Sequence, residues 1–173
     1  MEVKPYYLPG FLKHSLLSWA EYEHALNTSE PHQIEWIDDN HEKHPYDKKK
    51  IQNNTVILSG LKKHKLDYTL IKDFLALRDS IPYQEWGLHA YASYKKGNVS
   101  FPSHWDFANN YIIQCEGRCR WILQGHFDIV LTKGDLIFIP AKCVHQCVPL
   151  EKRLSLSFPL WEKKKFTQRS HEF

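Results

Sequence analysis

Three side chains in the second half of the chain have the types and spacing of metal ligands. His104 and Asp106 are two residues apart in SHWDFANNYIIQCEGRCRWIL, directly before an alternating apolar run. In an extended chain, residues i and i+2 point to the same face, so this imidazole and this carboxylate can converge on one ion. Downstream, GDLIFIPAKCVH places Gly134, a short apolar run, Pro140 and His145 in that order, and His145 lies forty-one residues after His104. The pattern predicts a metal centre.

The donor set also indicates what the metal does. Two neutral imidazoles and one carboxylate on one face of an octahedral Fe(II) leave three coordination positions open, two for a bidentate 2-oxo acid and one for dioxygen. We therefore expect a catalytic site and not a closed structural one. The residues alone leave an alternative, in which His104 ends a strand and His145 is a hydrogen-bonded histidine inside a β-barrel.

The combination resembles the JmjC-type, cupin-like oxygenases, which have a double-stranded β-helix fold and use Fe(II) and 2-oxoglutarate. The features that carry the resemblance lie within about residues 86–160: His-x-Asp at 104–106 with Trp105 between the ligands, the apolar run 111–113, Gln114, Gly117, and Gly-x5-Pro-x4-His ending at His145. The resemblance implies that His104, Asp106 and His145 are the catalytic metal ligands. It implies Fe(II) as the cofactor, with 2-oxoglutarate and dioxygen as co-substrates.

The distal carboxylate of 2-oxoglutarate requires a basic partner, because an unpaired charge inside a barrel is costly. In the family this base usually lies fifteen residues after the first histidine, where this chain has Cys119, and the flanking Arg118 and Arg120 have the opposite strand parity. After His145, the segment His-x3-Pro-x3-Arg-x-Ser resembles that of prolyl-hydroxylase-like and plant-type oxygenases, which implies Arg153 and Ser155 as the carboxylate partners. We expect Arg153; the alternatives are a register slip that brings in Arg118 or Arg120, or loss of 2-oxoglutarate binding.

Further polar residues are candidates for contacts with the co-substrate. Asn110 matches a position where related enzymes place a polar group near the iron. Tyr91, Tyr94 and Ser100 precede the His-x-Asp motif and have hydroxyl groups that can donate hydrogen bonds. On the strand that begins near Arg153, period-two alternation puts the serines at 155 and 157 on one face, and the apolar residues 154, 156 and 158 on the other, packed outward against helices.

After Pro82 the chain consists of short apolar runs separated by Gly, Asn or Lys turns, which predicts an all-β sandwich or barrel. The expected strands are 88–94, 111–114, 120–123, 127–131, 136–139 and 154–158. Upstream, 34–37 and 56–58 are possible short strands in a mostly polar segment.

Two helices are predicted before this β region. The first covers residues 9–27, opens near Pro9, and has an apolar face at Leu12, Leu16, Trp19, Tyr22 and Leu26. The second starts near residues 67–69 and ends before Pro82, with the inward stripe Leu70, Ile71, Phe74, Leu75 and Leu77. We therefore expect a mainly β, single-domain protein over 1–173, with an N-terminal helical and irregular layer at 1–85 packed outside a double-stranded β-helix core (cupin or jelly-roll barrel) at 86–160.

Composition narrows the protein class. The 173 residues are 42% hydrophobic and 25% charged with a formal net charge of +3, which is typical of a globular domain. No apolar run approaches the ~20 residues that cross a bilayer, and the N-terminus lacks the apolar core of a signal peptide, so we expect a soluble, cytoplasmic protein. The four cysteines at 115, 119, 143 and 147 do not have zinc-ribbon spacing. We expect small core residues, with a four-cysteine zinc site as the alternative.

The function expected from the sequence is hydroxylation of an unidentified substrate, a protein side chain in preference to a small molecule or an RNA base. One alternative is a metal-binding cupin that does not use 2-oxoglutarate, and another is a non-catalytic ligand-binding β-barrel, which Cys119 keeps open. The lysine runs at 48–50, 62–63 and 163–165 leave nucleic acid as a partner without support. Neither a membrane partner nor an oligomeric state is indicated.

Overall fold

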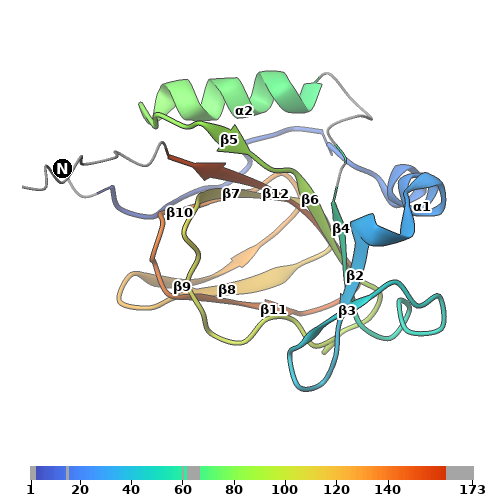
Figure 1. The fold of residues 1–173 in the computed structure, drawn as a ribbon. Helices are drawn as coiled ribbons and strands as arrows, with labels where there is room; N and C mark the ends of the chain where they lie inside the picture. Colours follow the sequence, from blue (N-terminus) through green and yellow to red (C-terminus); the bar gives the residue numbers. More distant parts are fainter. Residues whose placement is uncertain (1–2, 15, 60, 62–66, 163–173) are drawn as a thin grey trace, which may run out of the picture.

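The computed structural model describes residues 3–14, 16–59, 61 and 67–162 and is mainly β (Figure 1). Two antiparallel sheets enclose a barrel, and the helices α1 (Trp19–Thr28) and α2 (Asp67–Arg78) lie outside it. The larger sheet contains, in spatial order, β1 (Tyr6–Leu8), β10 (Leu136–Ile139), β7 (Asn109–Glu116), β12 (Arg153–Trp161), β6 (His89–Ser93), β4 (Thr55–Ser59), β2 (Ile34–Ile37) and β3 (Lys43–Pro45), with β5 (Glu85–Trp86) pairing with β12. The smaller sheet has the order β11 (His145–Pro149), β8 (Cys119–Leu123), β9 (Phe127–Leu131).

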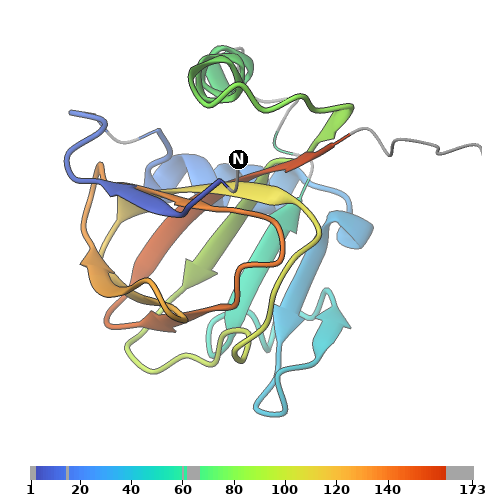
Figure 2. The same cartoon turned by 90° about the vertical axis from the view of Figure 1, so that its left-hand side faces the viewer.

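This architecture confirms the fold class expected from the sequence. All the expected strands are present, and β9 and β10 have the predicted bounds. Four strands were not predicted: β1, β3, β5 and β11. Figure 2 shows the barrel from the side, with strands β1 to β4 from the N-terminal half continuing the large sheet. The segment predicted as an outer layer thus also contributes to the sheet itself.

The predicted extent of the first helix was wrong. α1 begins at Trp19, not near Pro9, because Ser18 caps it: its hydroxyl accepts from the backbone N–H of Glu21, whose carboxylate accepts from the backbone N–H of Ser18. The preceding segment is held in a non-helical course, where the N–H of Leu12 donates to the carbonyl of Gly134. Ser-x-x-Glu was therefore the stronger start signal.

The inward stripe predicted for the second helix was also partly wrong. Phe74 and Leu77 are 55% and 81% exposed, whereas Tyr68 and Leu75 are fully buried. The helix lies across the large sheet in Figure 1. Its buried face contains Tyr68, Lys72, Leu75 and Ala76. The side chain of Leu70 lies outside the described part of the chain. None of the helices among the described residues is long and apolar enough to cross a membrane.

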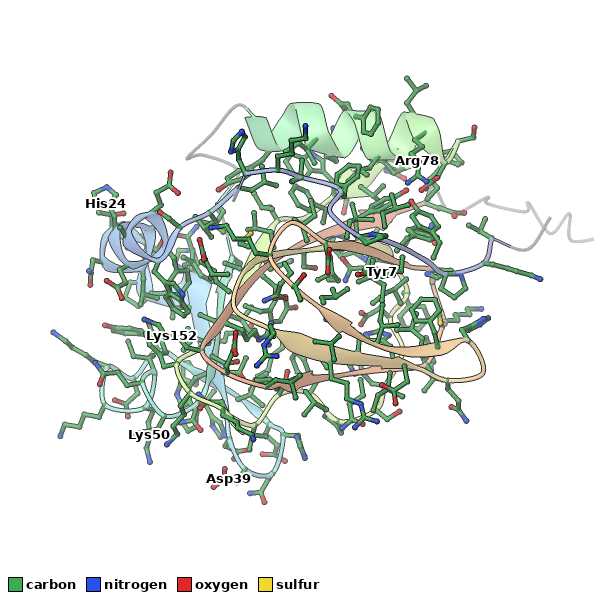
Figure 3. All side chains as sticks on the ribbon, turned by 180° about the vertical axis from the view of Figure 1, so that it is seen from behind. Tyr7, His24, Asp39, Lys50, Arg78 and Lys152 are labelled. Carbon is green, nitrogen blue, oxygen red and sulfur yellow. The ribbon has the colours of Figure 1, made fainter. Side chains whose placement is uncertain are left out.

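Two apolar clusters hold the fold together, and side chains fill the space between the layers (Figure 3). One lies between the large sheet and the helices and includes Leu154, Leu156 and Phe158, as the alternation on β12 predicted. The other lies between the sheets and includes Cys119, Trp121 and Cys147. Since alternate β12 residues serve the outer cluster, Arg153, Ser155 and Ser157 are left on the inner face of the barrel.

Candidate active site

The backbone brings the two candidate histidine ligands side by side. His104 and His145 form an antiparallel bridge, in which each residue's N–H donates to the other's carbonyl at 3.0 and 2.8 Å. Two residues along, the carbonyl of Asp106 accepts from the N–H of Lys142 at 2.7 Å. The loop that carries His-x-Asp is therefore fixed to the start of β11 by main-chain hydrogen bonds.

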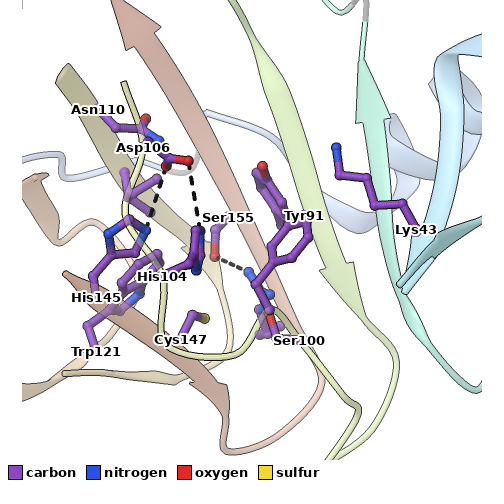
Figure 4. A pocket seen from close by; sticks show the side chains of 13 residues that line it. Lys43, Tyr91, Ser100, His104, Asp106, Asn110, Trp121, His145, Cys147 and Ser155 are labelled. Carbon is purple, nitrogen blue, oxygen red and sulfur yellow. Dashed lines mark hydrogen bonds and ion pairs between the residues drawn. The ribbon is translucent and has the colours of Figure 1, made fainter. Parts of the chain in front are cut away.

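The three side chains converge as metal ligands would. Their ligand atoms lie within 4.8 Å of one another, with Nε2 of His104 3.9 Å from Oδ1 of Asp106 and Nε2 of His145 3.7 Å from Oδ2 (Figure 4). Each imidazole uses its other nitrogen locally: Nδ1 of His104 lies 2.7 Å from the carbonyl oxygen of Pro102, and Nδ1 of His145 lies 2.9 Å from that of Cys143. A carbonyl accepts only from an Nδ1–H, so both Nε2 lone pairs face the carboxylate.

This tautomer leaves Nε2 free to bind a metal while Nδ1–H donates to a carbonyl, as is usual for metal-ligating histidines. Burial lowers the pKa of His145 from its ordinary value, which keeps the ring neutral. Two neutral imidazole nitrogens and one carboxylate therefore fit a divalent iron, and the residues present suit the metal that the sequence predicted.

The three ligands lie in the wall of a cavity of about 240 Å³. Of the residues expected to contact the co-substrate, Arg153, Ser155, Asn110 and Tyr91 also line it. Burial, and then the charge of Asp106, raise the pKa of Tyr91, so its phenol stays protonated. Ser100 lines the cavity, whereas Tyr94 packs against Trp19 outside the barrel and is not part of the site.

Arg153 is the most deeply placed charge in this cavity. It is 1% exposed; its Nε donates to Ser93 at 3.1 Å and its Nη1 to Ser155 at 3.1 Å. Ser155 in turn donates to Oε1 of Gln114 at 2.8 Å. No carboxylate from the described residues contacts the guanidinium, and no hydrogen bond from them reaches Nη2. The serines thus orient a buried cation without neutralising it.

The other two candidate arginines have the opposite character. Arg118 pairs with Glu151 at 3.0 Å and Arg120 with Asp128, and both side chains are about half exposed. Cys119 between them points inward, where its sulfur lies 2.7 Å from that of Cys147. Burial opposes ionisation of Cys147, but the Cys119 thiol and the Arg153 guanidinium lower its pKa to about 7. All four cysteines are free.

Five residues of the cavity wall were not identified as site residues from the sequence: Lys43, Phe101, Ile112, Trp121 and Cys147. Lys43 reaches it from β3, in a segment predicted to be irregular, and nothing in the local sequence indicates this. Trp121 lines it from β8. Because Trp121 is two residues after Cys119 on the same strand, the two side chains point to the same face, and this spacing could have identified Trp121.

A second group of possible ligands, Asp38, Glu42 and His44, lies in the hairpin between β2 and β3. Asp38 already accepts from the backbone N–H groups of Asn40 and Glu42, each at 2.9 Å, and contacts Nε2 of His44 at 2.9 Å. These contacts account for the cluster as the cap of a turn.

The comparisons with known proteins agree with this geometry. Residues 124–167 match the family model of the JmjC domain. No curated protein matches the chain in sequence. The ribosomal oxygenase YcfD from Escherichia coli, in complex with cobalt and succinic acid, has a TM-score of 0.71 at 19% identity, over 94% of this chain and 49% of that one. Its complex with cobalt and 2-oxoglutarate gives 0.68 at 16% identity, with the same coverage.

The chain spans about half the length of these YcfD structures. At identities this low, the structural similarity establishes a shared fold and nothing more. Together with the family model, this similarity confirms the resemblance to JmjC-type, cupin-like proteins that the His-x-Asp and distal His motifs indicated.

Proposed function

We propose that this protein is an Fe(II)- and 2-oxoglutarate-dependent oxygenase that hydroxylates a substrate C–H bond. The observation that carries the proposal is Arg153, a buried guanidinium that opens into the same cavity as the three metal ligands and has no carboxylate partner among the described residues. A buried charge is costly unless it is paired. A small dianion fits this cavity at both ends. A 2-oxo acid group at one end can bind the metal, and a carboxylate at the other can pair with Arg153.

Each residue then has a defined role. His104, Asp106 and His145 hold the iron, which supplies activation of dioxygen when bound. Arg153 and Ser155 bind the distal carboxylate, where the planar guanidinium suits two oxygens. Tyr91 donates a hydrogen bond from its protonated phenol to the co-substrate, and Asn110 contributes a polar group beside the metal end.

The reaction balances without a further reductant. One atom of dioxygen enters the substrate as a hydroxyl group, and the other enters the new carboxylate of succinate. The first carbon of 2-oxoglutarate leaves as carbon dioxide. The YcfD complexes with cobalt and either 2-oxoglutarate or succinic acid support this proposal through the shared fold.

For the primary substrate we propose a protein side chain. Its support is a pair of aromatic rings: Trp105 and Phe107, 45% and 76% exposed, flank the metal ligand Asp106 in the sequence. Exposed aromatic side chains next to a reactive centre are typical of protein contacts. The YcfD relative is named a ribosomal oxygenase, which favours the same class.

The first test is an anaerobic titration of the purified protein with Fe(II) and then 2-oxoglutarate. We expect the weak visible absorption band of a metal-chelated 2-oxo acid. Iron binding without the band would contradict the proposal and leave a metal-binding cupin of another kind. Failure to bind iron would leave a non-catalytic barrel.

The substrate class is tested with isotopically labelled dioxygen. The loaded enzyme is incubated with a protein extract and, separately, with the RNA of the same cells. We expect one labelled oxygen atom in a protein side chain, detected by peptide mass spectrometry. Label found only in RNA bases would contradict a protein substrate.

A further inference from the structure

The cavity contains one more polar group that the roles above do not use. The indole ring of Trp121 is 6% exposed and lies in the cavity wall, and its Nε1–H has no hydrogen-bond partner among the described residues. Buried donors are rarely left unpaired in folded proteins, so each exception requires an explanation. A buried, unpaired donor on a side chain that lines a ligand site is explained if the ligand is its acceptor.

The strand register places this indole near the metal end of the cavity. On β8, Cys119, Trp121 and Leu123 face inward, and Leu123 pairs with His145 across the small sheet. Trp121 is the next inward residue, and its ring centroid lies 5.9 Å from that of His145 (Figure 4). The smaller sheet therefore carries both a metal ligand and an unpaired neutral donor.

The opposite wall already accounts for the distal carboxylate. Arg153 and Ser155 are on β12, in the large sheet, within a network that also includes Ser93 and Gln114. At the metal end, an ion balances most of the charge of the bound carboxylate, so a neutral N–H is a suitable partner for its remaining oxygen.

We propose that the Nε1–H of Trp121 donates a hydrogen bond to the 1-carboxylate of the 2-oxo acid, so that the small sheet binds one end of the co-substrate and Arg153 the other. This inference rests on the proposed function. It assigns a binding role to a residue type that does not carry charge, on the strand where the basic residue of the family is replaced by Cys119.

The test compares two 2-oxo acids. Pyruvate has the 2-oxo acid group and lacks the distal carboxylate, so it reports on the metal end alone. In Trp121→Phe, which removes the N–H and keeps an aromatic ring, we expect the dissociation constants of both 2-oxoglutarate and pyruvate to rise about tenfold. Binding is followed anaerobically by the chelate absorption band. Trp161→Phe, an exposed tryptophan at the far end of β12, is the matched control and is expected to change neither value.

A second measurement reads the donor directly in the wild type and uses the variant only to assign the signal. In the Zn(II)-loaded wild type with nitrogen-labelled tryptophan, the Trp121 indole N–H resonance, assigned by its loss in Trp121→Phe, is expected to move downfield on addition of either 2-oxo acid. An unmoved resonance, or an unchanged affinity in Trp121→Phe with metal content intact, would overturn the inference while leaving the proposed function in place. Weaker 2-oxoglutarate binding with unchanged pyruvate binding would also overturn it, since the donor would then serve the distal end. If the iron-loaded wild type binds neither acid, the proposed function itself fails.

Discussion

The two ends of the cavity satisfy their polar groups in different ways. At the metal end, the side chains of His104 and Asp106 are 32% and 43% exposed, so water can hydrate them when no ion is bound. At the anion end, Arg153 is 1% exposed and lacks a carboxylate partner in the described structure. Forming the metal end without a bound ion therefore costs the fold little free energy. The anion end holds a cation whose nearest acidic group is the Cys147 thiol, and the fold gains stability there when a carboxylate anion arrives.

The largest expected effect is at the metal end. Asp106→Ala removes the only carboxylate of the proposed ligand set, and we expect metal affinity to fall by more than about 100-fold, since loss of a mere outer-shell partner already costs 10- to 100-fold. Calorimetric titration with Co(II) or anaerobic Fe(II) measures this.

Asp38→Ala is the matched control, because Asp38 is a carboxylate beside a histidine in the β2–β3 hairpin. It is expected to keep one metal per chain with unchanged affinity. If Asp38→Ala loses the metal and Asp106→Ala keeps it, the metal end has been assigned to the wrong cluster.

The second prediction concerns a variant that removes the cation of the anion end and leaves the metal ligands in place. Arg153→Met replaces the buried cation with an apolar side chain of similar length. We expect 2-oxoglutarate affinity to fall roughly 100-fold with metal affinity unchanged. In the absence of ligand we expect the free energy of unfolding to rise by about 1 kcal/mol, because a buried charge without a carboxylate partner has been removed.

Equilibrium denaturation with and without 2-oxoglutarate tests both parts. Arg120→Met, which removes an exposed partner of Asp128, is expected to change neither the affinity nor the response to the ligand. If Arg118 or Arg120 variants lose 2-oxoglutarate and Arg153→Met does not, the cation of the anion end has been misidentified.

The same contrast explains what could be predicted from the sequence. His104, Asp106 and His145 occur in short motifs at strand ends, and local parity is enough to bring the first two together. Strands that form short apolar runs between turn residues, such as β9 and β10, could be predicted equally well. β3 was not, because its residues Lys43–Pro45 are polar and it exists only through pairing with β2.

The anion end needed information that no local pattern holds. Ser93 reaches Arg153, and Gln114 reaches Ser155, only because β12 lies between β6 and β7 in the large sheet. The exposure of Phe74 and Leu77 on α2 likewise depends on how the helix lies on that sheet. Apolar periodicity predicts that a helix has an inward face, but packing selects which one.

The third prediction concerns backbone strain beside Arg153, at the anion end. Gly117 has φ of +70°, and a Cβ there would overlap the carbonyl oxygen of Lys152, directly before Arg153. Gly117→Ala is expected to lower the free energy of unfolding by about 1–3 kcal/mol or more and to weaken 2-oxoglutarate binding, because the start of β12 must move.

Gly134→Ala is the matched control for this strain. Gly134 has φ of +87°, and its Cβ would overlap the carbonyl oxygen of Leu12, which belongs to the N-terminal segment and not to the cavity. We expect a similar loss of stability with unchanged affinity for 2-oxoglutarate. Equal weakening of ligand binding in both variants would mean that general destabilisation, and not the position of β12, causes the loss.

The smallest expected effect separates the two ends within one strand. Ser155 and Ser157 are two residues apart on the inner face of β12: Ser155 contacts Arg153 and Gln114, whereas Ser157 donates to Oδ1 of Asn110 at 2.8 Å. Ser155→Ala removes one hydrogen bond to the guanidinium, so we expect 2-oxoglutarate to bind roughly fivefold more weakly, equivalent to about 1 kcal/mol. Ser157→Ala leaves those contacts in place and is expected to change the affinity less than twofold. Because the two substitutions are chemically identical, titration of both variants under the same conditions cancels general effects of losing a buried hydroxyl. A larger loss in Ser157→Ala would place the recognition of the co-substrate nearer to Asn110 and the metal than to Arg153.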